Sequence, residues 1–194
     1  NIGLAMLMAG YARSQRHPAM RIWTWSKLVV GTAYLMGWLQ EPGSPAWQSI
    51  AANTMVMAGI TLEVSAYCTF FGFTHWKRVL YPFASLSLLA YIGMRVAGAP
   101  VVYASALMSS VIAAMIGTMA FVLLRPGGAG SFLRRIIGVN DLAFFLATGA
   151  FALTILFPGS FALLTARAAQ ISTLTTGYLL VIVSGFGVLV LCKE

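Results

Sequence analysis

The sequence predicts an all-α, polytopic transmembrane helix bundle of about seven spans, at ~20 residues per span. Two observations lead to this prediction. Of the 194 residues, 60% are hydrophobic and 8% are charged, whereas an average soluble domain has roughly 25% charged residues. The hydrophobic residues also fall into continuous runs that are too long for barrel strands, and helices satisfy their own backbone hydrogen bonds in lipid. Residues 1–194 are therefore expected to form a single transmembrane helical domain.

Clusters of proline, glycine and charged residues divide the chain into its hydrophobic runs. The predicted spans cover approximately residues 1–12, 22–39, 47–73, 79–94, 101–124, 139–157 and 171–191. Because the first run is short and no methionine precedes it, we expect a truncated first helix and a cut end at Lys193-Glu194. Aromatic residues typical of membrane interfaces lie at the run ends: Trp23, Trp25, Trp47, Trp76 and Tyr81.

The basic residues predict the orientation of the bundle. All but two of the twelve fall in or beside alternate loops, on one side of the predicted membrane: Arg13, Arg16, Arg21, Lys27, Lys77, Arg78, Arg125, Arg134, Arg135 and Lys193. Because positive residues favour the cytoplasmic side, the N-terminus is expected outside and the C-terminus inside. The net charge of +8 is thus interpreted as a topology signal, and no nucleic-acid partner is expected.

Glu63 is the most unusual residue within the predicted spans. It lies ten positions before Phe73, about 15 Å along a helix and so near the middle of the hydrocarbon core. A carboxylate at this depth is costly and normally faces the bundle interior, neutral or paired. We interpret Glu63 as a candidate ligand-binding or proton-sensing residue, with Tyr67 one turn away. The alternative is a structural hydrogen bond between helices.

Arg95 and Arg167 are the two basic residues on the opposite side. Both are candidates for binding an anionic group, such as a lipid headgroup, and both also fit cations that extend to the interface. Arg95 and Glu63 are predicted to differ by about two helical turns in depth, so no salt bridge between them is expected.

Small residues recur at helical spacing in two of the predicted spans. One row consists of Ser105, Ser109, Ala113 and Gly117, and the other of Thr173, Gly177 and Gly185. Such rows allow helices to approach closely in lipid. They predict helix packing, either within the bundle or across a dimer, and packing within the bundle is favoured for the first row.

The sequence lacks the usual signatures of catalytic and metal sites. Cys68 and Cys192 cannot form a disulfide framework, and neither His17 nor His75 has a second ligand at metal spacing. Asn140-Asp141 is interpreted as the N-terminal cap of the sixth predicted span. Without paired carboxylates, a phosphate loop or a nucleophile motif, the 194 residues are not expected to form an enzyme by themselves, and no catalytic residue, metal or cofactor is assigned to them.

The pattern of several residues resembles the multi-span N-terminal membrane region of bacterial GGDEF proteins, the diguanylate cyclases. They are Trp23, Gly31, Pro42 and Pro45 in one loop, and Asn53 followed by Gly59. In addition, residues 177–191 followed by Cys192-Lys193-Glu194 look like the helix that leads into such a protein's cytoplasmic linker. The GGDEF signature itself does not occur in the chain, and Glu63 matches no family position, so no site residue is carried over.

The resemblance implies a sensory or regulatory module of the bacterial inner membrane. A cytoplasmic cyclase after residue 194 would condense two GTP molecules into cyclic di-GMP. GTP and Mg²⁺ are expected only in that output domain. The implied partners are the lipid bilayer, a second copy of the chain and a lipid-like or small hydrophobic ligand, and the last span is expected to transmit the signal within the homodimer.

Three other functions are also compatible with the sequence. A small-molecule transporter or channel would line a path with polar residues, which Glu63, Tyr67, Ser85, Ser87 and Thr118 could begin. The chain could also be the membrane sensor of a histidine kinase or another output domain, or a membrane scaffold that stands alone.

Overall fold

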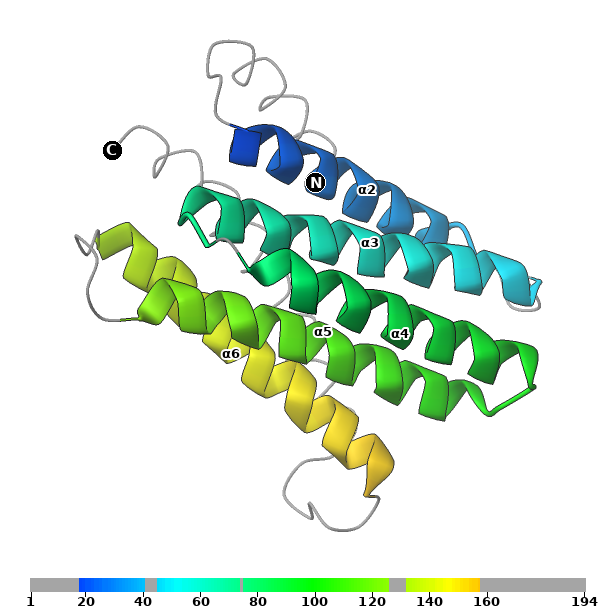
Figure 1. Ribbon diagram of the computed structural model, residues 1–194. Helices are drawn as coiled ribbons and strands as arrows, with labels where there is room; N and C mark the ends of the chain where they lie inside the picture. The colour runs from blue at the N-terminus through cyan, green and yellow to red at the C-terminus, as the bar shows by residue number, and fades with distance from the viewer. Residues whose placement is uncertain (1–17, 41–44, 74, 126–131, 158–194) are drawn as a thin grey trace. The chain divides into compact units, whose positions relative to one another are not determined.

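The computed structural model describes residues 18–40, 45–73, 75–125 and 132–157, and every regular element among them is a helix. The elements, shown in Figure 1, are α2 (Pro18–Trp38), α3 (Ala46–Phe70), α4 (Trp76–Val96), α5 (Val101–Leu124) and α6 (Phe132–Leu156). By length and composition, α3, α4, α5 and most of α6 qualify as membrane-crossing helices. The predicted all-helical architecture is therefore confirmed for the described residues, and four of their helices are long and apolar enough to cross a membrane. The predicted spans 1–12 and 171–191 lie outside the described residues.

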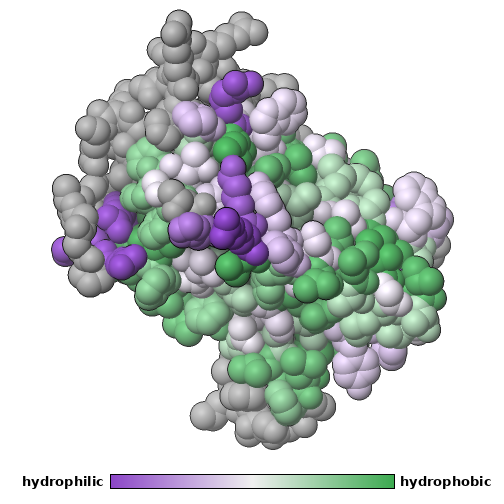
Figure 2. All heavy atoms as spheres, viewed as in Figure 1, coloured by the Kyte–Doolittle hydropathy of each residue, from purple (hydrophilic) through white to green (hydrophobic). Residues whose placement is uncertain are grey.

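The surface of the described helices is consistent with a lipid environment. Large hydrophobic side chains are exposed on several helices, including Trp38, Leu86, Leu89 and Phe121. In Figure 2, hydrophobic side chains cover much of the face in view and strongly hydrophilic ones gather in a few places. Exposed apolar surface on this scale is unfavourable in water but matches the acyl chains of a bilayer.

Helix boundaries follow the proline and glycine marks in the sequence. Pro45 and Pro100 immediately precede α3 and α5, where a missing N–H costs no helical hydrogen bond. Gly72 and Gly98 follow α3 and α4 with φ of 70° and 73°, the left-handed conformation that glycine adopts without strain. After α3, the N–H of Phe73 donates to the carbonyl of Cys68 at 3.0 Å, which completes the glycine-based termination.

The chain divides into two units, residues 1–99 and 100–194. In the first unit, α3 packs against both α2 and α4, and it lies between them in Figure 1. In the second unit, α5 packs against α6.

Helices α2 and α3 approach most closely at Gly59. A Cβ atom there would lie 2.3 Å from Cγ2 of Val30 and 3.2 Å from the backbone carbonyl oxygen of Ser26. The hydroxyl of Ser26 donates to the carbonyl oxygen of Gly59 at 2.7 Å. The absence of a side chain at residue 59 therefore permits both the close approach and this hydrogen bond between helices.

In the second unit, the predicted row of small residues on α5 includes one close contact with α6. A Cβ at Gly117 would lie 2.9 Å from Cδ2 of Phe145, and Ala113, one turn earlier, is buried. Ser105 and Ser109 are half-buried on the same helix. The second predicted row, Thr173, Gly177 and Gly185, lies outside the described residues.

The predicted start of the sixth span is wrong. The sequence placed it at residue 139, with Asn140-Asp141 as its cap, but α6 begins at Phe132. Asp141 consequently lies in the third turn of the helix and is 1% exposed, which excludes an N-terminal cap. The error came from assigning Arg134 and Arg135 to a loop, although long basic side chains are tolerated in the first turn of a membrane helix.

Arg134 has a specific role that explains its place in the helix. Its Nε donates to the carbonyl oxygen of Leu123 at 2.8 Å, and its Nη2 donates to that of Val122 at 2.9 Å. These carbonyls belong to the last turn of α5, where helical partners are missing. The first turn of α6 thus caps the C-terminus of α5, and the positive charge also suits the negative end of the α5 dipole.

Replacement of Arg134 by glutamine is expected to destabilise the second unit by about 1–2 kcal/mol. Two fully buried hydrogen bonds from a charged donor would contribute more, but Arg134 is only partly buried. Thermal unfolding in detergent measures the change. The matched control is Arg135→Gln, because Arg135 is the exposed neighbour on the same helix. Equal destabilisation by the two variants would contradict the capping role.

Candidate functional site: a buried ion pair between α2 and α3

One face of α2 is directed at α3. Trp23, Ser26, Lys27 and Val30 recur at i, i+3, i+4 and i+7, the spacing of a single helical face, and all four are buried. Trp23 is 1% exposed, so its indole packs inside the helix pair; its predicted depth near the membrane interface stays a prediction.

Lys27 and Glu63 form a buried ion pair at this interface. The distance from Nζ of Lys27 to Oε1 of Glu63 is 2.5 Å, and the two side chains are 3% and 4% exposed. The ammonium also lies 5.0 Å from the centroid of the Trp23 ring, within the range of a cation–π interaction. The carboxylate and the aromatic ring together compensate a charge that would otherwise be highly unfavourable in an apolar interior.

Neighbouring hydroxyl groups on α3 are engaged with their own helix. Thr61, Ser65 and Thr69 each donate to the carbonyl four residues earlier, at 2.7 Å in every case. Side chains of this kind satisfy their hydrogen-bonding capacity locally. These hydroxyl groups therefore donate to their own helix, and the ion-pair partner of Glu63 among the described residues is Lys27.

Tyr67 lies one turn after Glu63 on α3 and is 4% exposed. The predicted grouping of these two residues is thus compatible with their positions on the helix. Arg167, the remaining residue of the predicted ligand site apart from Arg95, lies outside the described residues.

Arg95 is far from Glu63. The side-chain amide of Asn53 donates to the hydroxyl of Tyr91 at 2.8 Å, which sets the register between α3 and α4. Glu63 is ten residues along α3 from this contact, and Arg95 is four residues beyond it in the opposite direction. At 1.5 Å per residue, the two differ by about 21 Å in depth, close to four turns rather than the predicted two.

Three of the polar residues that could begin a transport path, Ser85, Ser87 and Thr118, do not share one buried surface. Ser85 is exposed and Ser87 is buried, so the two point to different sides of α4. Thr118 belongs to the second unit, is exposed and donates to the carbonyl of Ala114 at 2.9 Å. Within the described part of the chain, no group of three or more His, Cys, Asp or Glu could hold a metal ion.

The role of Lys27 was not predicted from the sequence. Its charge was assigned to the cytoplasmic side, although Lys27 lies near the middle of α2. The available signal was one basic residue inside the predicted span 22–39 and one acidic residue inside the next predicted span, 47–73. Helices joined by a short loop run antiparallel, so such residues are candidates for pairing.

Comparison of the chain with protein-family models, curated proteins and solved structures found no match. The described residues form helices, four of which are long and apolar enough to cross a membrane, and an ion pair is buried between α2 and α3.

Proposed function

We propose that the chain is a sensory or regulatory module of the bacterial inner membrane that controls a cytoplasmic diguanylate cyclase attached after its last span. In this proposal the module crosses the membrane seven times, with its N-terminus outside and C-terminus inside, and works as a homodimer. The observation that supports regulation best is the Lys27–Glu63 pair. The cyclase output is supported by the resemblance of residues such as Trp23, Asn53 and Gly59.

The ion pair is suited to a regulatory role because its stability depends strongly on its surroundings. In an apolar interior, the attraction between the charges and the cost of removing them from water are both large. A change in hydration, a proton or a competing ligand would therefore shift the balance between the paired arrangement of α2 and α3 and an unpaired one. A signal of this kind acts only through its different affinity for the two arrangements.

A proton-coupled transporter is the second candidate, and the same pair favours it. Ionisable residues inside a helix bundle also serve as proton relays. In that case Glu63 would exchange a proton with Lys27 or with a substrate during each cycle. The two functions differ in their output: one changes the rate of an attached enzyme, and the other moves protons across a vesicle membrane.

The test uses the full-length protein in native membranes. We expect it to convert GTP to cyclic di-GMP in the presence of Mg²⁺, and we expect Glu63→Gln to change this rate several-fold at equal protein level in the membrane. The exchanged variant Lys27→Glu/Glu63→Lys restores the pair and is expected to return the rate toward that of the unaltered protein. Ser85→Ala, at an exposed position on α4, is the matched control.

Each outcome bears on a separate part of the proposal. Absence of cyclic di-GMP formation by the intact protein would refute the cyclase output. An unchanged rate in Glu63→Gln would refute the regulatory role of the pair. Proton uptake by vesicles that contain the protein, abolished by Glu63→Gln, would instead establish the transporter.

A further inference from the structure

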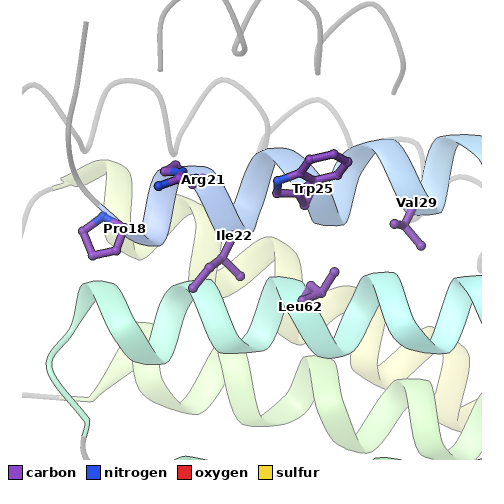
Figure 3. Close-up of a pocket in the computed structure, with 6 residues that line it drawn as sticks. All are labelled: Pro18, Arg21, Ile22, Trp25, Val29 and Leu62. Atoms are coloured by element: carbon purple, nitrogen blue, oxygen red, sulfur yellow. The ribbon is translucent and has the colours of Figure 1, made fainter. Parts of the chain in front are cut away.

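A groove runs along α2 on a face different from the one that carries the ion pair. It has a volume of about 450 Å³, and the side chains that line it are drawn in Figure 3. They are Pro18, Arg21, Ile22, Trp25 and Val29 of α2, and Leu62 of α3. The α2 residues recur at three- and four-residue intervals and so form one stripe along the helix.

The chemistry of the groove changes along its length. Arg21, in the first turn of α2, is the one positively charged residue among the described residues that line the groove. Trp25 lies one turn further along, with 62% of its surface exposed. Val29 is a further turn along, about 12 Å from Arg21 at the helical rise. Leu62 of α3 contributes to the apolar wall. A cation, an indole and an apolar channel thus follow one another along the helix.

Arg21 is exposed in the first turn of α2. No hydrogen bond or ion pair joins it to another residue in the described ranges, unlike Arg134, whose guanidinium is occupied by backbone carbonyls. Guanidinium groups bind phosphate with two parallel hydrogen bonds. Arginine and tryptophan are also the residue types that prefer the interface between headgroups and acyl chains.

We propose that this groove binds one anionic phospholipid, with its phosphate on Arg21 and an acyl chain along Ile22, Val29 and Leu62. The Arg21 cation at one end favours a negatively charged headgroup, and the other described lining residues, which are apolar or aromatic, match a hydrocarbon chain rather than a soluble ligand. The bound lipid contacts both α2 and α3 and therefore stabilises the helix pair that carries Lys27 and Glu63. This inference concerns lipid binding alone and stands independently of any output domain.

The experiment measures lipid binding to the whole protein by native mass spectrometry, with phosphatidylglycerol and phosphatidylethanolamine offered in turn. We expect preferential retention of one phosphatidylglycerol molecule. Arg21→Gln is expected to weaken this binding about tenfold, equivalent to one charge-assisted hydrogen bond. Arg78→Gln is the matched control, because Arg78 is exposed in the first turn of α4 and does not line the groove.

Two further measurements test the acyl-chain position. Val29→Trp fills the groove and is expected to abolish retention of the lipid while the helical content by circular dichroism stays unchanged. Phosphatidylglycerol with brominated acyl chains is expected to quench the fluorescence of the unaltered protein more than that of Trp25→Phe.

The proposal is overturned if the two lipids are retained equally, or if Arg78→Gln weakens binding as much as Arg21→Gln. Retention of the lipid by a correctly folded Val29→Trp variant would likewise exclude the groove as the binding site. Absence of any retained lipid would also overturn the proposal.

Discussion

Replacement of Lys27 by methionine is expected to destabilise the α2–α3 pair by about 3–5 kcal/mol, the largest effect of any substitution considered for this protein. The change leaves the Glu63 carboxylate 4% exposed without its cation. Thermal unfolding of the protein in detergent at neutral pH measures the effect.

The double variant Lys27→Met/Glu63→Met separates the pair from its components. Removing both charges leaves an apolar interface of similar volume, which is often as stable as the buried pair or more so. We therefore expect the double variant to be more stable than Lys27→Met alone. A double variant at least as unstable as the single one would show that Lys27 contributes through packing rather than through its charge.

The second large effect is expected at Gly59. Replacement by leucine is expected to destabilise the same helix pair by about 3 kcal/mol, the upper end of the usual range for overpacking. The added Cβ alone would contact Cγ2 of Val30 at 2.3 Å and the backbone of Ser26 at 3.2 Å. Because a backbone atom cannot move aside as a side chain can, α2 must shift, and the hydrogen bond from Ser26 to Gly59 is lost with it. Cysteine crosslinking between α2 and α3 would report the shift.

Gly93 supplies the control for Gly59. It lies within α4, and a Cβ there would meet no atom within 4 Å. Gly93→Ala is expected to be neutral or to stabilise the helix by about 0.5–1 kcal/mol, since alanine loses less backbone entropy than glycine. A loss of stability in Gly93→Ala comparable to that in Gly59→Leu would mean that close approach at residue 59 is not the cause.

Most of the helices could be predicted from the sequence. The length of a hydrophobic run and the proline and glycine residues at its ends are properties of a single segment of the chain. The predicted span 101–124 coincides with α5, and the others overlap their helices with ends that differ by a few residues. The exception is α6, whose start was placed at residue 139 instead of Phe132. Arg134 looks like a loop residue by its charge, and only the neighbouring end of α5 reveals why it belongs to a helix.

Of the two residues in the buried ion pair, only Glu63 could be identified from the sequence. Glu63 is conspicuous in the sequence because an acid in an apolar run has a high cost. Lys27 is inconspicuous because a basic residue near a basic loop has an ordinary explanation. Their pairing depends on the register between α2 and α3, which is set by the approach at Gly59 and by the hydrogen bond from Ser26. Composition and periodicity do not contain that register.

The ion pair also has a consequence for how the protein is made. By length and composition, four of the described helices are apolar enough to cross a membrane, and α2 is not one of them. A lysine at the centre of a helix adds about 2.5–3.5 kcal/mol to the free energy of membrane insertion. Neutralisation by Glu63 requires that α3 be present. In the proposed topology, α2 and α3 would thus leave the translocon together as a helical hairpin, so biogenesis of the first depends on synthesis of the second.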